Sequence, residues 1–174
     1  MSRCISVLGT SHRLQGARKA TRVLHVDDPD YGRYLEGLLR PKHFDFVFEE
    51  AAGYGPTIAE QLTAKFLGEG QYLDVDPHPR NRAKFGIPPL RDERTQINAD
   101  DDRSCVQHED LEGQEEREKL WVSRVQGQSF DFALLICGYL HTLSLSFRLR
   151  SAGFSVMQTS VYMPHHKLGR LGTA

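Results

Sequence analysis

The fold is decided by the stretch FDFALLIC at residues 130–137, which is followed by GYLH at residues 138–141. Every residue of the first segment except Asp131 is apolar. An apolar run of this length is typical of a strand that is buried on both faces of a parallel sheet. We therefore expect residues 130–137 to form the central strand, and the glycine after them to begin a turn out of the sheet.

The segments on either side of this stretch alternate between strand and helix patterns. The helix patterns place apolar residues on one face, as Tyr31, Leu35 and Leu38 do. Strands that alternate with helices predict a three-layer α/β fold, with a mostly parallel sheet and helices on both faces. The expected strands are residues 5–8, 44–48, 72–76 and 155–163, and the expected helices are residues 30–39, 56–67, 78–84, 111–125 and 142–151, the last with Leu143, Phe147 and Leu149 in the core.

The chain has 174 residues, the usual size of one domain, so we expect a single α/β domain over residues 1–174. Residues 88–110 are polar and charged and are expected to form a mobile loop. The basic stretch at residues 164–174 is expected to be a frayed tail.

Composition excludes several classes of protein. A net charge of −1 and a pI of about 6.7 disfavour a broad nucleic-acid-binding surface. The three cysteines include no Cys-x-x-Cys pair, which disfavours a disulfide framework and a zinc ribbon. The sequence shows no secretory signal, and its longest apolar run is far shorter than the ~20 residues of a membrane helix. These observations predict a cytoplasmic protein with no membrane segment.

Polar side chains follow each of the first four main strands. Because the carboxyl ends of parallel strands meet at one edge of a sheet, these side chains should gather there, where α/β sheets bind their ligands. In particular, residues 9–12 and 138–141 should become neighbours. The polar residues at the four strand ends are Thr10, Ser11 and His12, then Glu49 and Glu50, then Asp74 and Asp76, and finally Tyr139 and His141.

Histidines and carboxylates brought together suit a divalent metal ion or acid–base catalysis. Two adjacent glutamates repel each other unless a cation or an arginine lies between them. The expected catalytic residues are Glu49, Glu50, His12, His141 and Arg117, the expected metal ligands are His12, His141 and Glu49, and the expected ligand-binding residues are Gly9, Thr10, Ser11, Arg13, Gly138 and Tyr139.

Some of these residues also have a plainer interpretation. Either glutamate could cap the helix expected from residue 56, because acidic side chains favour helix N-termini. Each histidine could belong to an ordinary loop. Of Asp74 and Asp76, one could belong to the site while the other pairs with Arg80 or Arg82.

Arg117 lies four residues before Trp121 on an expected helix, so the two share a face. Trp121 is expected in the core. Arg117 either pairs with Glu116 or Glu118 at the surface, or reaches the carboxylates as a clamp for a phosphate or an oxyanion.

The sequence lacks three motifs of common α/β enzymes: the dinucleotide fingerprint Gly-x-Gly-x-x-Gly, the P-loop and the Gly-x-Ser-x-Gly elbow. A serine hydrolase or a P-loop enzyme is therefore not expected.

The order of four short motifs that span nearly the whole chain resembles the superfamily of TraB/PrgY, the Tiki proteases, ChaN and the erythromycin esterases. The matching motifs are GTSH at 9–12, EE at 49–50, ERE at 116–118 and GYLH at 138–141. The resemblance implies an α/β fold and, in several branches, metal-dependent hydrolysis, although the chain is shorter than most members and a match would not fix the substrate.

Three functions are compatible with these patterns. In the first, His12, His141 and one of Glu49 or Glu50 hold a divalent ion, while the other glutamate is the general base in hydrolysis of an ester, amide or phosphoester. In the second, the domain binds or cleaves a nucleotide without metal, with phosphate held by residues 9–11 and 53–55. In the third, it is a non-catalytic module that binds a partner protein. The expected partners are thus a small-molecule or peptide substrate or a nucleotide, and the sequence leaves the oligomeric state open.

Overall fold

A computed structural model describes residues 3–11, 14, 29–51, 56–88 and 113–162 of the chain. The expected mobile loop, except Pro88, and the expected frayed tail lie outside these residues. His12, Arg13 and the glycines at 53 and 55 lie outside them as well.

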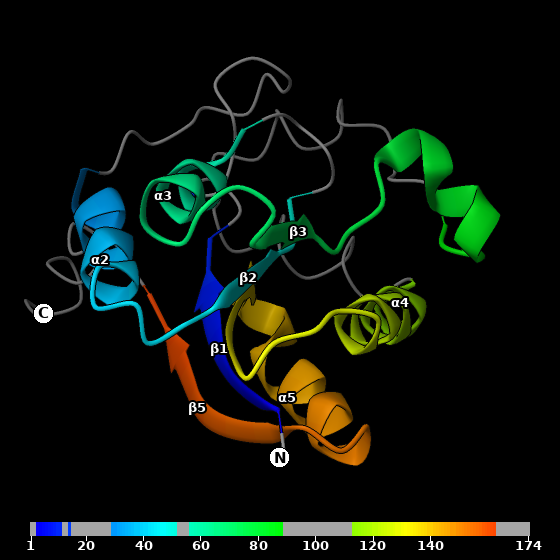
Figure 1. Cartoon of the computed structure of the whole chain (residues 1–174). Coiled ribbons are helices and arrows are strands. Elements are labelled where there is room, and N and C mark those ends of the chain that lie inside the picture. The colour runs from blue at the N-terminus through cyan, green and yellow to red at the C-terminus, as the bar shows by residue number, and fades with distance from the viewer. Residues whose placement is uncertain (1–2, 12–13, 15–28, 52–55, 89–112, 163–174) are drawn as a thin grey trace, which may run out of the picture.

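Five parallel strands form one sheet in the order β3-β2-β4-β1-β5 (Figure 1). The apolar stretch at residues 130–137 forms β4 (Phe132–Gly138) at its centre, between β2 (Phe46–Glu49) and β1 (Cys4–Thr10). The edge strands are β3 (Tyr72–Asp74) and β5 (Ser155–Val161). The prediction of a parallel sheet around this central strand is therefore confirmed.

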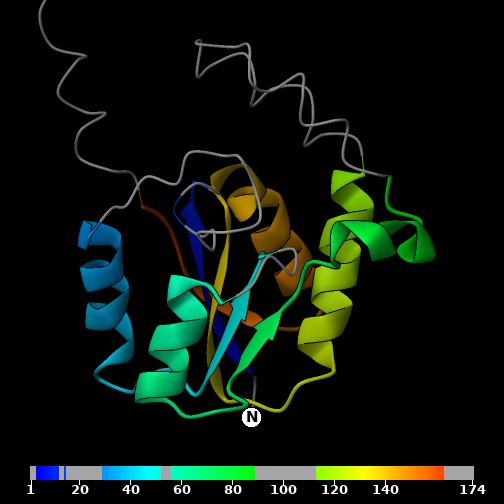
Figure 2. The ribbon, with the colours of Figure 1, turned by 90° about the horizontal axis from the view of Figure 1, so that it is seen from above.

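Helices cover both faces of the sheet, as predicted for three layers. In Figure 2, α2 and α3 lie on one side of the strands and α4 and α5 on the other. A 3-10 helix, η1, follows β3, and a shorter one, η3, connects β4 to α5. The helices span α2 (Pro29–Leu39), α3 (Ile58–Phe66), η1 (Pro79–Phe85), α4 (Gln114–Gln126), η3 (Tyr139–His141) and α5 (Thr142–Ser151).

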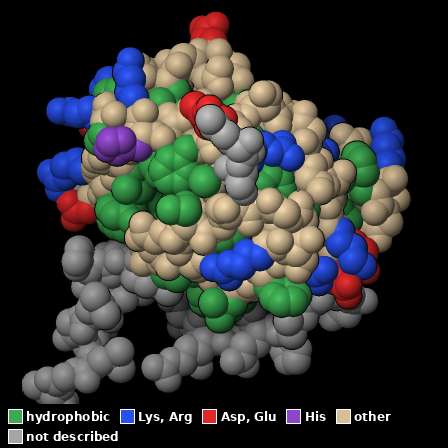
Figure 3. Space-filling view, turned by 60° about the horizontal axis from the view of Figure 1, so that its bottom comes forward, with side chains coloured by type: hydrophobic (Ala, Val, Ile, Leu, Met, Phe, Trp, Pro, Cys, Tyr) green, Lys and Arg blue, Asp and Glu red, His purple; other side chains and the backbone are tan. Residues whose placement is uncertain are grey.

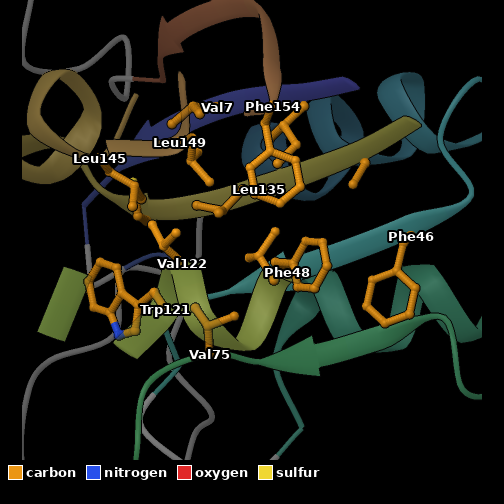
Figure 4. Packing of buried hydrophobic residues seen from close by; sticks show 14 of the residues in the cluster. Val7, Phe46, Phe48, Val75, Trp121, Val122, Leu135, Leu145, Leu149 and Phe154 are labelled. Carbon is orange, nitrogen blue, oxygen red and sulfur yellow. The ribbon is translucent and has the colours of Figure 1, made fainter. Parts of the chain in front are cut away.

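The strands divide their apolar side chains between two cores, because successive side chains of a strand point to opposite faces. In β2, Phe46 and Phe48 join the core under α4 and α5, whereas Val47 joins the core under α2 and α3. Figure 4 shows the first of these cores, in which the rings of Phe46 and Phe48 lie 4.6 Å apart and Trp121 closes one end. The prediction that Trp121 is a core residue is confirmed.

Of the three residues predicted to lie in the core from α5, two do not, so the prediction is wrong for them. Leu149 is buried, but Leu143 and Phe147 are exposed to solvent. The buried side of α5 carries Leu145 and Leu149 together with the small polar residues Thr142 and Ser146. The exposed side carries as many large apolar residues as the buried side, so hydrophobicity alone does not identify the side that faces the sheet.

Strand β3 ends at Asp74, two residues earlier than predicted. The side chain of Asp74 accepts hydrogen bonds from the peptide N–H groups of Ala51 and Asp76, both at 3.0 Å. These bonds turn the chain out of the sheet and fix the end of β3 against the end of β2. The predicted short helix follows as η1.

Among the described residues, no helix is both long and apolar enough to span a membrane. Figure 3 shows one face of the molecule, on which Lys and Arg side chains are spread among hydrophobic and neutral ones. On this face the positive charges do not gather into one basic surface, in agreement with the near-neutral net charge.

Candidate functional site at the carboxyl edge of the sheet

The ends of β1, β2 and β4 lie side by side. In the parallel register Gly9 is opposite Cys137 and Thr10 is opposite Gly138. On the other side of β4, the peptide N–H of Glu50 donates to the carbonyl of Ile136 at 2.9 Å. The expectation that the segment after Gly9 and the segment after Gly138 leave the same edge is confirmed, while the position of His12 lies outside the described residues.

Gly9 is required by the close approach of the chain after β4. A Cβ atom on Gly9 would lie 2.3 Å from Cγ2 of Thr142 and 2.9 Å from Cα of Tyr139. The absence of a side chain lets η3 cross directly over the end of β1. The residue predicted to bind a ligand thus has a packing role that places His141 beside the sheet.

A buried ionic network occupies the α4 side of this edge, and we call it the carboxyl-edge network. Arg117 reaches inward from α4, and its Nη2 donates to Oε1 of Glu50. Its Nε lies 3.2 Å from Oδ1 of Asp76. The other oxygen of Glu50 accepts from the peptide N–H of Gly138 at 2.8 Å. Of the two predicted alternatives for Arg117, the structure shows the one in which it reaches the carboxylates.

Asp76 is the point at which three donors meet. Besides Arg117, it accepts hydrogen bonds from Nη2 of Arg82 at 2.8 Å and from the indole N–H of Trp121 at 3.0 Å. One of Asp74 and Asp76 was expected to pair with Arg80 or Arg82, and this pair is Asp76 with Arg82. A buried aspartate with this many donors is fully satisfied, which suits a structural anchor for α4.

His141 completes the network from η3 and is fully buried. Its Nδ1 lies 2.9 Å from Oε1 of Glu118. Its Nε2 lies 3.7 Å from Oε1 of Glu50 and has no hydrogen-bond partner among the described residues. The ring also stands edge-on to Trp121, with centroids 4.8 Å apart.

Burial alone would lower the pKa of His141, but the charge of Glu50 and the hydrogen bond to Glu118 outweigh it and raise the pKa above its ordinary value. Burial would raise the pKa of Glu118, but hydrogen bonds outweigh that effect and lower it. These bonds come from His141, Ser144, Gln114 and Arg148. The contacts of the network therefore favour the protonated form of His141 and the ionised form of Glu118.

Glu49 does not join this network, because it leaves the opposite face of β2 from Glu50. Its Oε2 accepts hydrogen bonds from Oγ1 of Thr57 and from the hydroxyl of Tyr72, the latter at 2.8 Å. Its Oε1 is buried and has no hydrogen-bond partner among the described residues. Burial is the main cause that raises the pKa of Glu49 to about 8, so this side chain is a neutral acid at neutral pH.

The sequence interpretation placed both glutamates in one site, and the structure separates them. Their expected mutual repulsion does not arise, because side chains alternate along a strand. Neither glutamate caps α3, since Thr57 does so by accepting from the peptide N–H of Glu60 at 3.0 Å.

Two charged residues of the network, Glu118 and Arg148, were missed as site residues. Glu118 receives Nε of Arg148 at 2.9 Å and the hydroxyl of Ser144 at 2.6 Å. The sequence places Glu118 in the ERE motif at 116–118 and as a possible surface partner of Arg117, but not among the expected site residues. Its spacing of three residues from Trp121 puts it on the buried side of α4, and this was the available signal.

The described residues fit a metal ion only in part. No three His, Cys, Asp or Glu side chains within the described segments are grouped so that they could hold one. His141 Nε2 and Glu50 Oε1 are two donors on one side of the sheet, but Glu49 faces the other side. Arginines already balance the charge of Glu50, Asp76 and Glu118. The predicted set of His12, His141 and Glu49 is therefore not brought together by the part of the chain that the structure describes.

A shallow pocket of about 380 Å³ opens next to the network, between the end of β3, η1 and α4. Asp76 forms part of its lining, together with His78, Lys84 and Arg124.

Cys137 is also buried at this edge, but it is not a ready nucleophile. Burial, followed by the charge of Glu50, raises the pKa of its thiol.

Comparison with protein-family models returned no match, and comparison with curated proteins returned none either.

Proposed function

We propose that the chain is a hydrolase that acts on an ester, amide or phosphoester at the carboxyl edge of its sheet. The observation that carries the proposal is the geometry of His141. Its Nδ1 is held by Glu118 at 2.9 Å, while its Nε2 is buried, has no hydrogen-bond partner among the described residues, and lies 3.7 Å from Glu50. A histidine that is oriented through one nitrogen, while the other nitrogen has no hydrogen-bond partner, is suited to acid–base catalysis.

In this proposal Glu50 and His141 divide the acid–base work. Glu50, ionised beside Arg117, accepts a proton from the attacking water at Oε1. His141, which the neighbouring carboxylates keep protonated, donates its Nε2 proton to the leaving oxygen or nitrogen. The water oxygen forms the new bond to carbon or phosphorus. Passage of the accepted proton from Glu50 to His141 then restores both groups.

Arg117 and Glu118 act through these two residues. Arg117 fixes the carboxylate of Glu50 together with the peptide N–H of Gly138. Glu118 sets the ring orientation of His141 and stabilises its charged form. Both are positioning residues in the proposed reaction. The resemblance of the strand-end motifs to the TraB/PrgY and erythromycin esterase superfamily is a second support for hydrolysis.

The divalent ion expected from the sequence stays a prediction with its own test. A bound ion would polarise the substrate and lower the pKa of water. Metal analysis of untagged protein, and its comparison with His141→Gln, measures whether an ion binds in a way that depends on this histidine. An unchanged metal content in His141→Gln would contradict a site built on His141.

The catalytic proposal is tested with chromogenic esters, amides and phosphodiesters. We expect His141→Gln and Glu50→Gln to lower kcat/KM by about 10²-fold or more, as is usual for loss of a general acid or base. The matched controls are His43→Gln, in the exposed turn before β2, and Glu115→Gln, on the exposed side of α4; both should keep full activity. Circular dichroism establishes that each variant is folded. Full activity in folded His141→Gln would exclude the proposed role.

The pH profile provides a readout that a purely structural role would not move. Activity should fall as pH rises through the pKa of His141, because the acid loses its proton.

Thermal-shift measurements with nucleotides, with and without chelator, test the competing function, which is nucleotide binding without metal. Stabilisation by a nucleotide that is insensitive to chelator, without any hydrolysis, would favour nucleotide binding instead.

A further inference from the structure

The exposed apolar side chains of the described residues concentrate on one side of the molecule. Five of the seven exposed large hydrophobic residues come from η3, α5 and β5, which are consecutive in the chain. The relative exposures of Leu143, Phe147 and Met157 are 79%, 70% and 65%. We call this surface the α5–β5 face, and it consists of Leu140, Leu143, Phe147, Met157 and Val161.

Helix geometry places Leu143 and Phe147 beside the edge strand. The side of α5 that carries Ser144 and Arg148 contacts Glu118 of α4. The side that carries Ser146 contacts Thr159 of β5, with the two hydroxyls 3.0 Å apart. At about 100° per residue, Leu143 and Phe147 point away from α4, next to the Ser146 side. They therefore border β5.

Strand β5 lacks two features that usually protect an edge strand, charged residues and proline, although its register with β1 shifts between Ile5 and Ser6. It pairs with β1 on one side and with no described strand on the other. Its sequence, SVMQTSV, contains no charged residue and no proline, although edge strands normally carry such residues to prevent pairing with another chain. The opposite edge, β3, is only three residues long.

We propose that the α5–β5 face binds a second copy of the same chain, with β5 antiparallel to its counterpart across a two-fold axis near Gln158. A two-fold axis makes the surface complementary to itself, so each strand edge meets an identical edge. It also sets α5 beside the α5 of the second copy, on one face of a continuous ten-stranded sheet. The absence of charge on β5 removes the repulsion that identical charged edges would create.

The exposed apolar area supplies more than half of what a stable dimer needs. With roughly 150–200 Å² for each complete side chain, the five apolar residues expose roughly 500 Å² per copy. The backbone edge of β5 and the exposed Gln158 and Thr159 extend this area toward the roughly 800 Å² per partner of a standard stable interface. This inference does not depend on the proposed function.

The test measures the mass of the full chain by light scattering after size exclusion, from low to high micromolar concentration. We expect a species of twice 19.8 kDa for the unchanged chain. Phe147→Glu and Met157→Lys should each shift it to the monomer, because both place a charge in the apolar interface. The matched control is Phe85→Glu, on η1, which changes another exposed aromatic residue and should leave the dimer intact.

Hydrogen exchange of the amides at residues 155–161 identifies the occupant. In a dimer through β5, their protection should decrease on dilution and in Phe147→Glu. A monomer at every concentration would overturn the proposal. Protection that is independent of concentration would show that another segment of the same chain covers the edge, which also overturns it. A dimer that survives both Phe147→Glu and Met157→Lys would place the interface elsewhere.

Discussion

Replacement of Glu49 by glutamine should change the pH dependence of stability in a defined direction. The pKa of this carboxyl group is raised from 4.5 to about 8 in the folded protein. Below pH 4.5 both the folded and unfolded states hold the proton, so folding is unaffected by this group. Between 4.5 and about 8 only the folded state holds it, and the free energy of unfolding falls by about 1.4 kcal/mol per pH unit.

By about pH 8 the accumulated loss is on the order of 4–5 kcal/mol, a large fraction of the stability of an ordinary domain. Glutamine has the same shape and carries no titratable proton. Its oxygen can still accept from Thr57 and Tyr72. We therefore expect Glu49→Gln to match the unchanged protein near pH 4.5 and to become progressively more stable than it as pH rises.

Urea unfolding followed by circular dichroism, at several pH values from 4.5 to 8.5, measures this difference. Glu69→Gln, in the exposed turn before β3, is the matched control and should parallel the unchanged protein throughout. Other groups titrate over the same range, but they cancel in the difference between the two curves. A difference between Glu49→Gln and the unchanged protein that stays constant with pH would refute the assignment of Glu49 as a buried neutral acid.

Three further predictions use the same unfolding assay. Arg117→Met should lower the free energy of unfolding by about 3–5 kcal/mol, because it leaves buried carboxylates without a counter-ion. Its control, Lys119→Met, removes an exposed ion pair and should change stability little. Equal losses of stability in the two variants would contradict the buried network. Gly9→Ala should lower the free energy of unfolding by about 1–3 kcal/mol, because the added methyl group collides with the chain after β4. Its control, Gly37→Ala, lies in open space on α2 and should raise the free energy of unfolding by about 0.5–1 kcal/mol. A Gly9→Ala variant as stable as the unchanged protein would refute the packing role. The pKa of His141 is raised in the folded protein, so its contribution to stability is complete below pH 6.5 and is lost as pH rises through the pKa of the folded state. His141→Gln should remove this loss of stability. A variant with the same pH dependence of unfolding as the unchanged protein would contradict the prediction.

Much of the fold follows from patterns that are local in the sequence. The apolar stretch of β4 identifies the central strand, and the alternation of strand and helix segments gives a parallel three-layer sheet. The sides of α5 were not predictable in the same way. Leu143 and Phe147 look like core residues in isolation, and only the position of α5 over β1 and β5 shows that their side faces outward.

For the site, the topology rule brought the correct strand ends together but did not assign the faces. Parallel pairing of β1 with β4 placed Gly9 and Gly138 at one edge, as expected. The rule does not show which of two adjacent carboxylates turns toward which layer, and both were therefore placed in the site. The spacing of Glu118 from Trp121 indicates the buried side of α4, but it does not identify the partners Ser144 and Arg148, which lie on a different helix.

The opposite orientations of Glu49 and Glu50 have a consequence for the charge that each residue carries. A slip of β2 by one position would exchange the two side chains between the layers. Each layer would still receive one glutamate, and burial or the guanidinium of Arg117 would again decide whether that glutamate keeps its proton. Two chemically identical neighbours thus acquire different charges only because each faces a different layer of the fold.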